Sequence, residues 1–140
     1  MAAEKVSVLT DLGKLVLRLI IGIGIMTHGY PKIFGVNDEG VARMIGFTDG
    51  VAKLGLPYPG FLAWAAALSE FVGGFLLAVG LFTRIAAAMI AITMAVALYR
   101  HRADPYGRME LALAYFAPSF FLALSGPGRF SLDALLFKRK

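Results

Sequence analysis

The stretch from Leu12 to Gly35, LGKLVLRLIIGIGIMTHGYPKIFG, decides what kind of protein this chain forms. Most of it is as apolar as a membrane-spanning helix, and it is long enough for a hydrocarbon core, which requires roughly 20 helical residues. Arg18 nevertheless lies inside the run, and His28 and Lys32 lie towards its end. A charge inside a bilayer needs a partner, so the position of Arg18 raises the question of which residue it pairs with.

The composition indicates an integral membrane protein whose main surroundings are the lipid bilayer. The 140 residues are 59% hydrophobic and 16% charged, which is more apolar surface than one small soluble core could bury. The net charge of +5 does not indicate a nucleic-acid partner, because the basic residues flank apolar runs, where they suit lipid headgroups. The chain has no cysteine, which excludes disulfides, thiolate metal ligands and redox chemistry through its own thiols.

Four apolar runs predict an all-α membrane protein, a four-transmembrane-helix bundle that forms a single domain over residues 1–140. The predicted spans are Leu12–Phe34, Gly60–Phe82, Arg84–Arg100 and Met109–Ser125. The last is the shortest and holds Pro118, which removes a backbone donor and is expected to kink the helix. The first run could instead be a cleaved signal sequence, but the internal Arg18 and the lack of a suitable cleavage site favour a mature helix.

The segments outside the spans are expected to lie at the membrane surface. An amphipathic pattern within Gly35–Pro59 predicts a short interfacial helix in the first loop. The C-terminal segment GPGRFSLDALLFKRK predicts a second one, with Ser131 as its N-cap and Asp133 in its first turn. Basic residues divide almost evenly between the two sides of the predicted bundle, and the tail Lys138–Lys140 favours cytoplasmic termini.

Glu70 is the acid that lies deep inside an apolar run, and we expect it to be the partner of Arg18. Counted from the end where the first span leads into the second, Arg18 lies roughly 22 Å deep and Glu70 roughly 16 Å deep. An arginine side chain can cover that difference, which predicts an intramembrane ion pair between the two spans. The alternative is that Arg18 reaches the near interface past Lys14 while Glu70 stays protonated.

Small residues on the same two spans favour close helix packing. Gly22 and Gly29 share a stripe on the first span, and Ala65, Ser69 and Gly73 recur every four residues on the second. We interpret them as ordinary helix contacts.

A second polar group is expected at the opposite end of the bundle. It consists of His28, Lys32, His101 and Glu110. Two imidazoles, a lysine and a carboxylate around one mouth could bind an anion or exchange protons with a quinone headgroup. The alternative is an interfacial belt in which each residue faces lipid headgroups separately, and for each residue alone this is the commoner arrangement. No metal site is predicted, because two histidines and scattered acids lack ligand spacing.

The order of these motifs resembles the DoxX family of small bacterial membrane proteins. The resemblance covers nearly the whole chain and is carried by LVLRLIIGIGIMTHGYPKIFG, LGLPYPG, LSEFVGGFLLAVGLFTR and GPGRFSLDALL. It implies a four-helix bundle in the inner (plasma) membrane. Arg18, Glu70 and the segment Gly126–Asp133 correspond to the family's characteristic positions, which carry no established catalytic role.

The resemblance implies a redox association rather than a defined reaction. The family is named after its similarity to a subunit of a thiosulfate:quinone oxidoreductase, so one hypothesis is a subunit of a quinone-linked membrane complex. His28 or Glu70 would then handle protons, and a soluble or membrane redox partner would supply electrons. The other hypothesis is a non-enzymatic scaffold or small-molecule carrier, in which Arg18 and Glu70 fix the helix register. Both remain open at the level of sequence, as does the question of whether the chain is an enzyme.

Overall fold

Helices alone build the fold over residues 2–137, the part of the chain that the computed structural model describes, with side chains described from residue 7. The helices are α1 (Ala2–Phe34), α2 (Arg43–Ala52), α3 (Pro59–Val79), α4 (Thr83–Arg100), α5 (Tyr106–Ser125) and α6 (Leu132–Leu136). The predicted all-α class is therefore confirmed. The basic tail Lys138–Lys140 lies outside the described residues.

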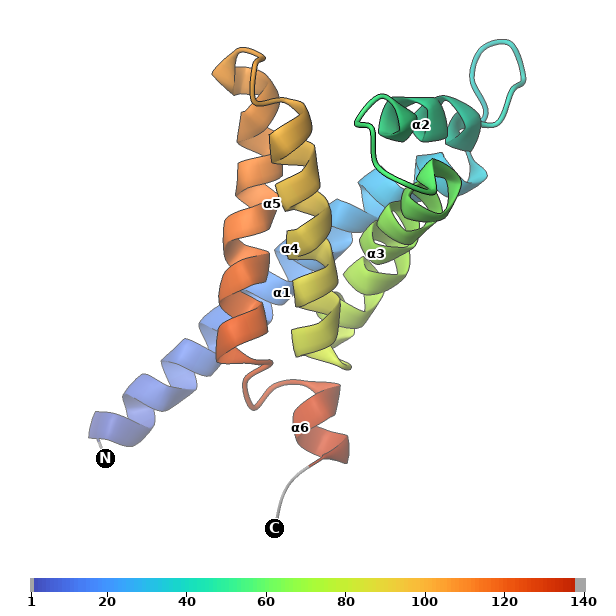
Figure 1. The fold of residues 1–140 in the computed structure, drawn as a ribbon. Helices are drawn as coiled ribbons and strands as arrows, with labels where there is room; N and C mark the ends of the chain where they lie inside the picture. The colour runs from blue at the N-terminus through green and yellow to red at the C-terminus, as the bar shows by residue number, and fades with distance from the viewer. Residues whose placement is uncertain (1, 138–140) are drawn as a thin grey trace.

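The four long helices run between two ends of the molecule (Figure 1). α1 packs mainly against α3, α4 packs mainly against α5, and α3 and α4 are neighbours joined by a tight turn. The short helix α2 lies across the end where α1 finishes and α3 begins, whereas α6 lies at the other end (Figure 1). α1 begins at the same end of the fold as α6, and the first-loop and C-terminal helices predicted from the sequence occupy opposite ends (Figure 1).

The boundaries of the helices differ from the predicted spans where the backbone turns. α3 ends at Val79 rather than at Phe82, because Gly80 adopts a left-handed conformation with φ of +74°. α1 extends well ahead of the predicted start at Leu12, and α5 begins one turn before the predicted start at Met109. Pro118 lies inside α5 without ending it.

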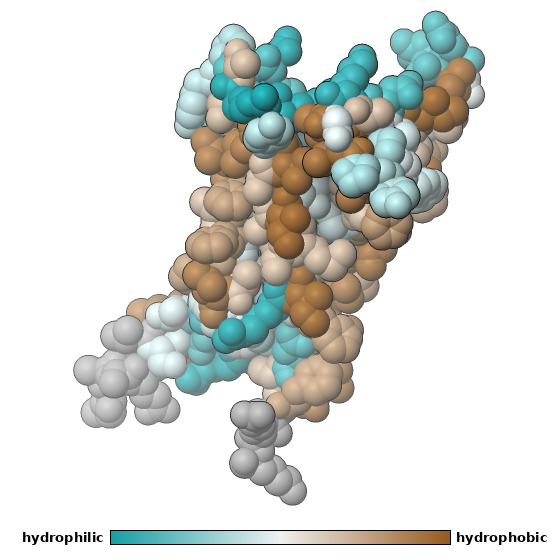
Figure 2. Space-filling model, in the orientation of Figure 1, coloured by the Kyte–Doolittle hydropathy of each residue, from teal (hydrophilic) through white to brown (hydrophobic). Residues whose placement is uncertain are grey.

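Apolar side chains cover the middle of the molecule. Figure 2 shows hydrophobic residues over the central part of the visible face and hydrophilic residues gathered towards both ends. Ile20, Ile92 and Leu124, from three different helices, are each more than 60% exposed. Among the described helices, α3 and α4 are long and apolar enough to cross a membrane, by length and composition. Exposure of this kind suits contact with lipid rather than water.

Glycines bring α1 and α3 into backbone contact and fix their register. A Cβ atom on Gly22 would lie 2.6 Å from the carbonyl oxygen of Gly74, and one on Gly29 would lie 2.6 Å from the backbone nitrogen of Phe71. Side chains larger than hydrogen cannot occupy these positions without separating the helices. The interpretation of Gly22 and Gly29 as helix contacts is confirmed. Gly73 is looser, since the nearest atom to a Cβ there would belong to the Ile90 side chain, at 3.6 Å.

Two apolar clusters hold the helices together. The larger one joins the four long helices through Ile21, Ile25, Leu77, Ala86, Ala87, Ile90, Met94, Ala112 and Leu122. The smaller one fixes α2 over the first half of α3 through Met44, Val51, Ala63 and Ala67. Since α2 is held beside α3 in this way, a space remains between α2, α3 and α4.

Candidate functional site

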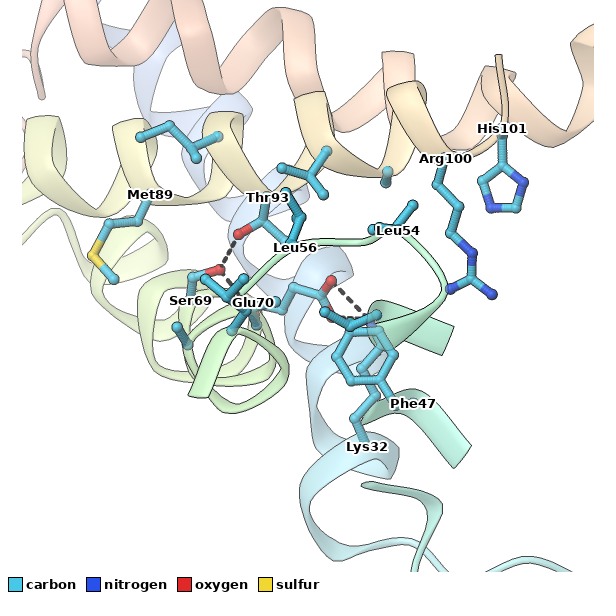
Figure 3. A pocket seen from close by; sticks show the side chains of 17 residues that line it. Lys32, Phe47, Leu54, Leu56, Ser69, Glu70, Met89, Thr93, Arg100 and His101 are labelled. Atoms are coloured by element: carbon cyan, nitrogen blue, oxygen red, sulfur yellow. Dashed lines mark hydrogen bonds and ion pairs between the residues drawn. The ribbon is translucent and has the colours of Figure 1, made fainter. Parts of the chain in front are cut away.

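A pocket of about 490 Å³ lies between α2, α3 and α4, with Lys32 from the end of α1 at its edge (Figure 3). Its lining is mostly aliphatic and extends along α4 from Met89 to His101, roughly 18 Å at the rise of a helix. The polar lining residues are Lys32, Ser69, Glu70, Thr93, Arg100 and His101. A long apolar wall with a few convergent polar groups is typical of small-molecule sites.

Lys32 and Glu70 form an ion pair in this pocket. The Lys32 Nζ atom donates to both carboxylate oxygens of Glu70, at 2.7 Å to Oε1 and 2.5 Å to Oε2. The Glu70 side chain is 3% exposed, whereas that of Lys32 is 26% exposed. The Nζ atom also lies 4.4 Å from the ring centre of Phe47 on α2, so the ring covers part of the ammonium. The acid is thus buried, and the lysine connects it to the open part of the pocket.

The register of α1 on α3 explains why Lys32 reaches Glu70. Gly29 lies against Glu70 and Phe71, since a Cβ at position 29 would come within 2.9 Å of the Glu70 Cβ atom. Lys32 is three residues further along α1, towards the α2 end. Side chains on a helix tilt towards its N-terminus, so the lysine points back to the level of Glu70. A small residue at position 29 leaves the carboxylate room beside α1.

The predicted ion pair between Arg18 and Glu70 is wrong. The same register places Arg18 beside Gly80, because a Cβ on Gly80 would collide with the Arg18 guanidinium. Gly80 lies ten residues from Glu70, roughly 15 Å along α3, which is too far for a contact. The alternative, in which Glu70 is left without a charged partner, is also wrong, because Glu70 pairs with Lys32, and Arg18 is covered by protein with 1% exposed.

Arg18 instead holds the segment that follows α5. Its Nη1 atom donates to the carbonyl oxygen of Pro127 at 2.7 Å, and its Nη2 atom donates to that of Phe130 at 2.5 Å. The negative charge of Asp133 also acts on the guanidinium. We call this group of Arg18, Pro127, Phe130 and Asp133 the C-terminal latch.

Asp133 connects the C-terminal latch to the turn between α3 and α4. Its two carboxylate oxygens accept hydrogen bonds from the backbone N–H groups of Phe82 and Thr83, at 2.7 and 2.9 Å, and so cap the start of α4. The Asp133 N–H group donates to the carbonyl oxygen of Gly80 at 2.8 Å. Ser131 accepts from the N–H group of Ala134, which confirms the predicted N-cap of α6.

The predicted polar mouth is assembled only in part. Lys32 and His101 line the same pocket, but His28 and Glu110 do not. The half-buried His28 ring packs edge-on against Tyr115 of α5 with 5.6 Å between ring centres, and Glu110 is exposed near the start of α5. The acid that joins Lys32 is Glu70. The four residues therefore do not line one common pocket.

His101 has its own acidic neighbour at the end of α4. Its Nδ1 atom lies 2.6 Å from the Oδ2 atom of Asp104 in the α4–α5 loop. This hydrogen bond holds the pKa of the Asp104 carboxyl below its usual value. His101 is thus fixed at the rim of the pocket.

Several lining residues were missed at the level of sequence. Ser69, noted there only as a small residue, shares a hydrogen bond of 2.7 Å with Thr93 across the α3–α4 contact. A usable signal was present, because Thr93 is the hydroxyl residue in the apolar middle of its run. Phe47 and Arg100 carried no such signal, since their role depends on where α2 docks.

The exposed apolar middle, the buried charges and the lateral pocket define a small helical membrane protein. Residues 13–102 match the DoxX family, and the chain belongs to this family. The resemblance inferred from the sequence motifs is thereby confirmed. No solved structure matches the chain significantly.

Three relatives cover almost the full chain. The protein named "Putative oxidoreductase CatD" from Bacillus subtilis (strain 168) is 34% identical over 132 residues, 93% of this chain and 91% of CatD. The inner membrane protein YqjF from Escherichia coli (strain K12) is 32% identical over 136 residues, 94% of this chain and 97% of YqjF. The uncharacterized membrane protein Rv3486 from Mycobacterium tuberculosis (strain ATCC 25618 / H37Rv) is 32% identical over 138 residues, 88% of this chain and 80% of Rv3486. The chain is a membrane protein.

Proposed function

We propose that this protein binds a quinone in the pocket between α2, α3 and α4, as a subunit of a redox-linked complex in the inner membrane. The observation that carries the proposal is the buried Lys32–Glu70 ion pair at the polar part of an otherwise apolar pocket. A quinone has the matching shape and chemistry, namely a ring with two carbonyl oxygens and an apolar tail. The oxidoreductase name of CatD agrees with this proposal.

The residues of the pocket can serve both the binding of a quinone and its protonation. Lys32 and Arg100 can donate hydrogen bonds to the ring oxygens, while the tail lies along the aliphatic wall of α4. Reduction of a quinone to a quinol takes up two electrons and two protons. Both protons can pass in turn through the Lys32 ammonium, which water at the open part of the pocket can reprotonate, while the Glu70 carboxylate favours its charged form. The chain has no cysteine with which to carry electrons, so the two electrons come from a bound cofactor or a redox partner protein.

Blocking the pocket should abolish quinone binding. Ala66 lines the pocket, and Ala66→Phe would place an aromatic ring inside it. Ala95, exposed on α4 and absent from the lining, gives the matched control Ala95→Phe. In purified protein, we expect Ala66→Phe to weaken binding of short-chain ubiquinone and menaquinone analogues by at least about tenfold, and Ala95→Phe to leave binding unchanged. Equal binding by all three proteins, or no binding by the wild type, would favour the scaffold or carrier hypothesis.

As part of this proposal, the membrane is crossed by α1, α3, α4 and α5, and both termini lie in the cytoplasm. Because the chain has no cysteine, single cysteines can be labelled in intact cells with an impermeant maleimide. The exposed positions that distinguish the topologies are Ser7, Asn37, Arg84, Arg108 and Phe137. We expect cysteines at Asn37 and Arg108 to be labelled and the other three to be protected. If only α3 and α4 cross, Ser7 and Phe137 will behave like Asn37 instead.

A further inference from the structure

Arg100 is the charged residue of the pocket that the rest of the described chain leaves without a partner. Lys32 and Glu70 neutralise each other, and His101 is bound to Asp104. Arg100 makes no ion pair or side-chain hydrogen bond within the described residues, although it lines the pocket. The polar part of the pocket therefore carries one positive charge that is not compensated by its own walls.

The guanidinium of Arg100 is positioned by α2. It extends from the end of α4 towards α2 (Figure 3). A Cβ atom on Gly50 would lie 3.0 and 3.1 Å from its two terminal nitrogens, so the guanidinium rests on the α2 backbone where a glycine leaves room. Gly50 is buried, and the adjacent Val51 belongs to the cluster that fixes α2 on α3. Arg100 thus presents its fork of donors at a defined place beside the apolar wall.

We propose that Arg100 binds the headgroup of the ligand in this pocket. The pocket therefore prefers ligands with an anionic oxygen on an apolar tail over neutral ligands of the same shape. This inference rests on the proposed pocket function and names its ligand class. A guanidinium donates hydrogen bonds to both kinds of oxygen, but only an anionic oxygen adds direct attraction between opposite charges. Two kinds of ligand carry an anionic oxygen on an apolar tail, namely an acidic quinone and a fatty acid with its carboxylate.

Matched probes separate the charge of the headgroup from its shape. One probe is an alkylated hydroxynaphthoquinone, whose acidic hydroxyl group is ionised at neutral pH, and the other is the methyl-substituted naphthoquinone with the same chain. We expect the purified wild type to bind the anionic probe about tenfold more tightly, because only its ionised oxygen attracts the guanidinium through opposite charge. A fatty acid of equal chain length that displaces the anionic probe identifies carboxylates as the source. Failure of the fatty acid to compete identifies the acidic quinone.

Substitution of Arg100 tests the residue itself. Arg100→Gln should weaken the anionic probe more than the neutral probe and so remove the preference, and Arg100→Lys should restore part of it. Arg102→Gln is the matched control, because Arg102 is exposed, lies over the Tyr99 ring at 4.0 Å and is not part of the lining. Equal affinity of the wild type for the two naphthoquinones, or an unchanged preference in Arg100→Gln, overturns this inference alone. If the purified wild type binds neither naphthoquinone, the proposed function is overturned.

Discussion

Replacing Lys32 by methionine is expected to lower the free energy of unfolding by about 3–5 kcal/mol, because it leaves the Glu70 carboxylate buried without its partner. Glu70→Gln should lower the free energy of unfolding by a smaller amount. The Lys32 ammonium is 26% exposed at the pocket and keeps its contact with the Phe47 ring, whereas Glu70 has almost no access to other polar groups. The double variant should lose less stability than the sum of the two single losses, since it leaves neither charge buried without a partner.

Unfolding in detergent of the wild type, both single variants and the double variant measures this coupling. Lys53→Met is the matched control, because Lys53 is exposed just after α2 and should change stability by less than about 0.5 kcal/mol. Strictly additive effects of the two substitutions would mean that Lys32 and Glu70 do not interact. A Glu70→Gln variant less stable than Lys32→Met would contradict the asymmetry expected from their exposure.

The helices themselves could be predicted from the sequence, because their signals are local. Apolar runs of sufficient length, glycines at the turns and the Ser131 cap are read from neighbouring residues. The predicted second span is longer than α3 for a local reason as well, since the left-handed Gly80 ends the helix before the apolar run ends. Local patterns also identified Arg18 and Glu70 as buried charges, which they are.

The partners of these charges could not be predicted in the same way. Depth counted along each helix treats the spans as parallel rods that start at the same level. The actual register is set by the contacts of Gly22 and Gly29 with α3, which place Arg18 at the end of α3 and bring Lys32 within reach of Glu70. The pocket depends on a further step, the docking of α2, which no periodicity in the long helices encodes.

The two buried charges also explain why distant motifs occur together in one chain. Glu70 binds a residue near the end of α1, at the pocket, while Arg18 binds the segment after α5 at the opposite end of the α1–α3 contact. The C-terminal motif GPGRFSLD is therefore part of the helix bundle, because its carbonyl groups receive Arg18 and its aspartate caps α4. α1 connects the pocket and the C-terminal latch.

Arg18→Gln is expected to lower the free energy of unfolding by about 3–5 kcal/mol and to release the C-terminal latch. The substitution removes two hydrogen bonds from a charged donor to the carbonyl groups of Pro127 and Phe130, and it leaves Asp133 without the opposing charge. Arg102→Gln is the matched control, because Arg102 is exposed beyond the other end of α4 and should have little effect.

Cysteine labelling separates release of the C-terminal latch from a general loss of stability. Ala134 is half-buried in α6, so a cysteine placed there should react slowly with maleimide while α6 is docked. Under native conditions, Arg18→Gln should raise its labelling rate several-fold, because the docked segment opens locally without unfolding of the helices. Lys32→Met should leave that rate unchanged, since Lys32 lies at the pocket end of α1. If Arg18→Gln lowers stability but does not speed labelling at position 134, the guanidinium stabilises the bundle without holding the C-terminal segment.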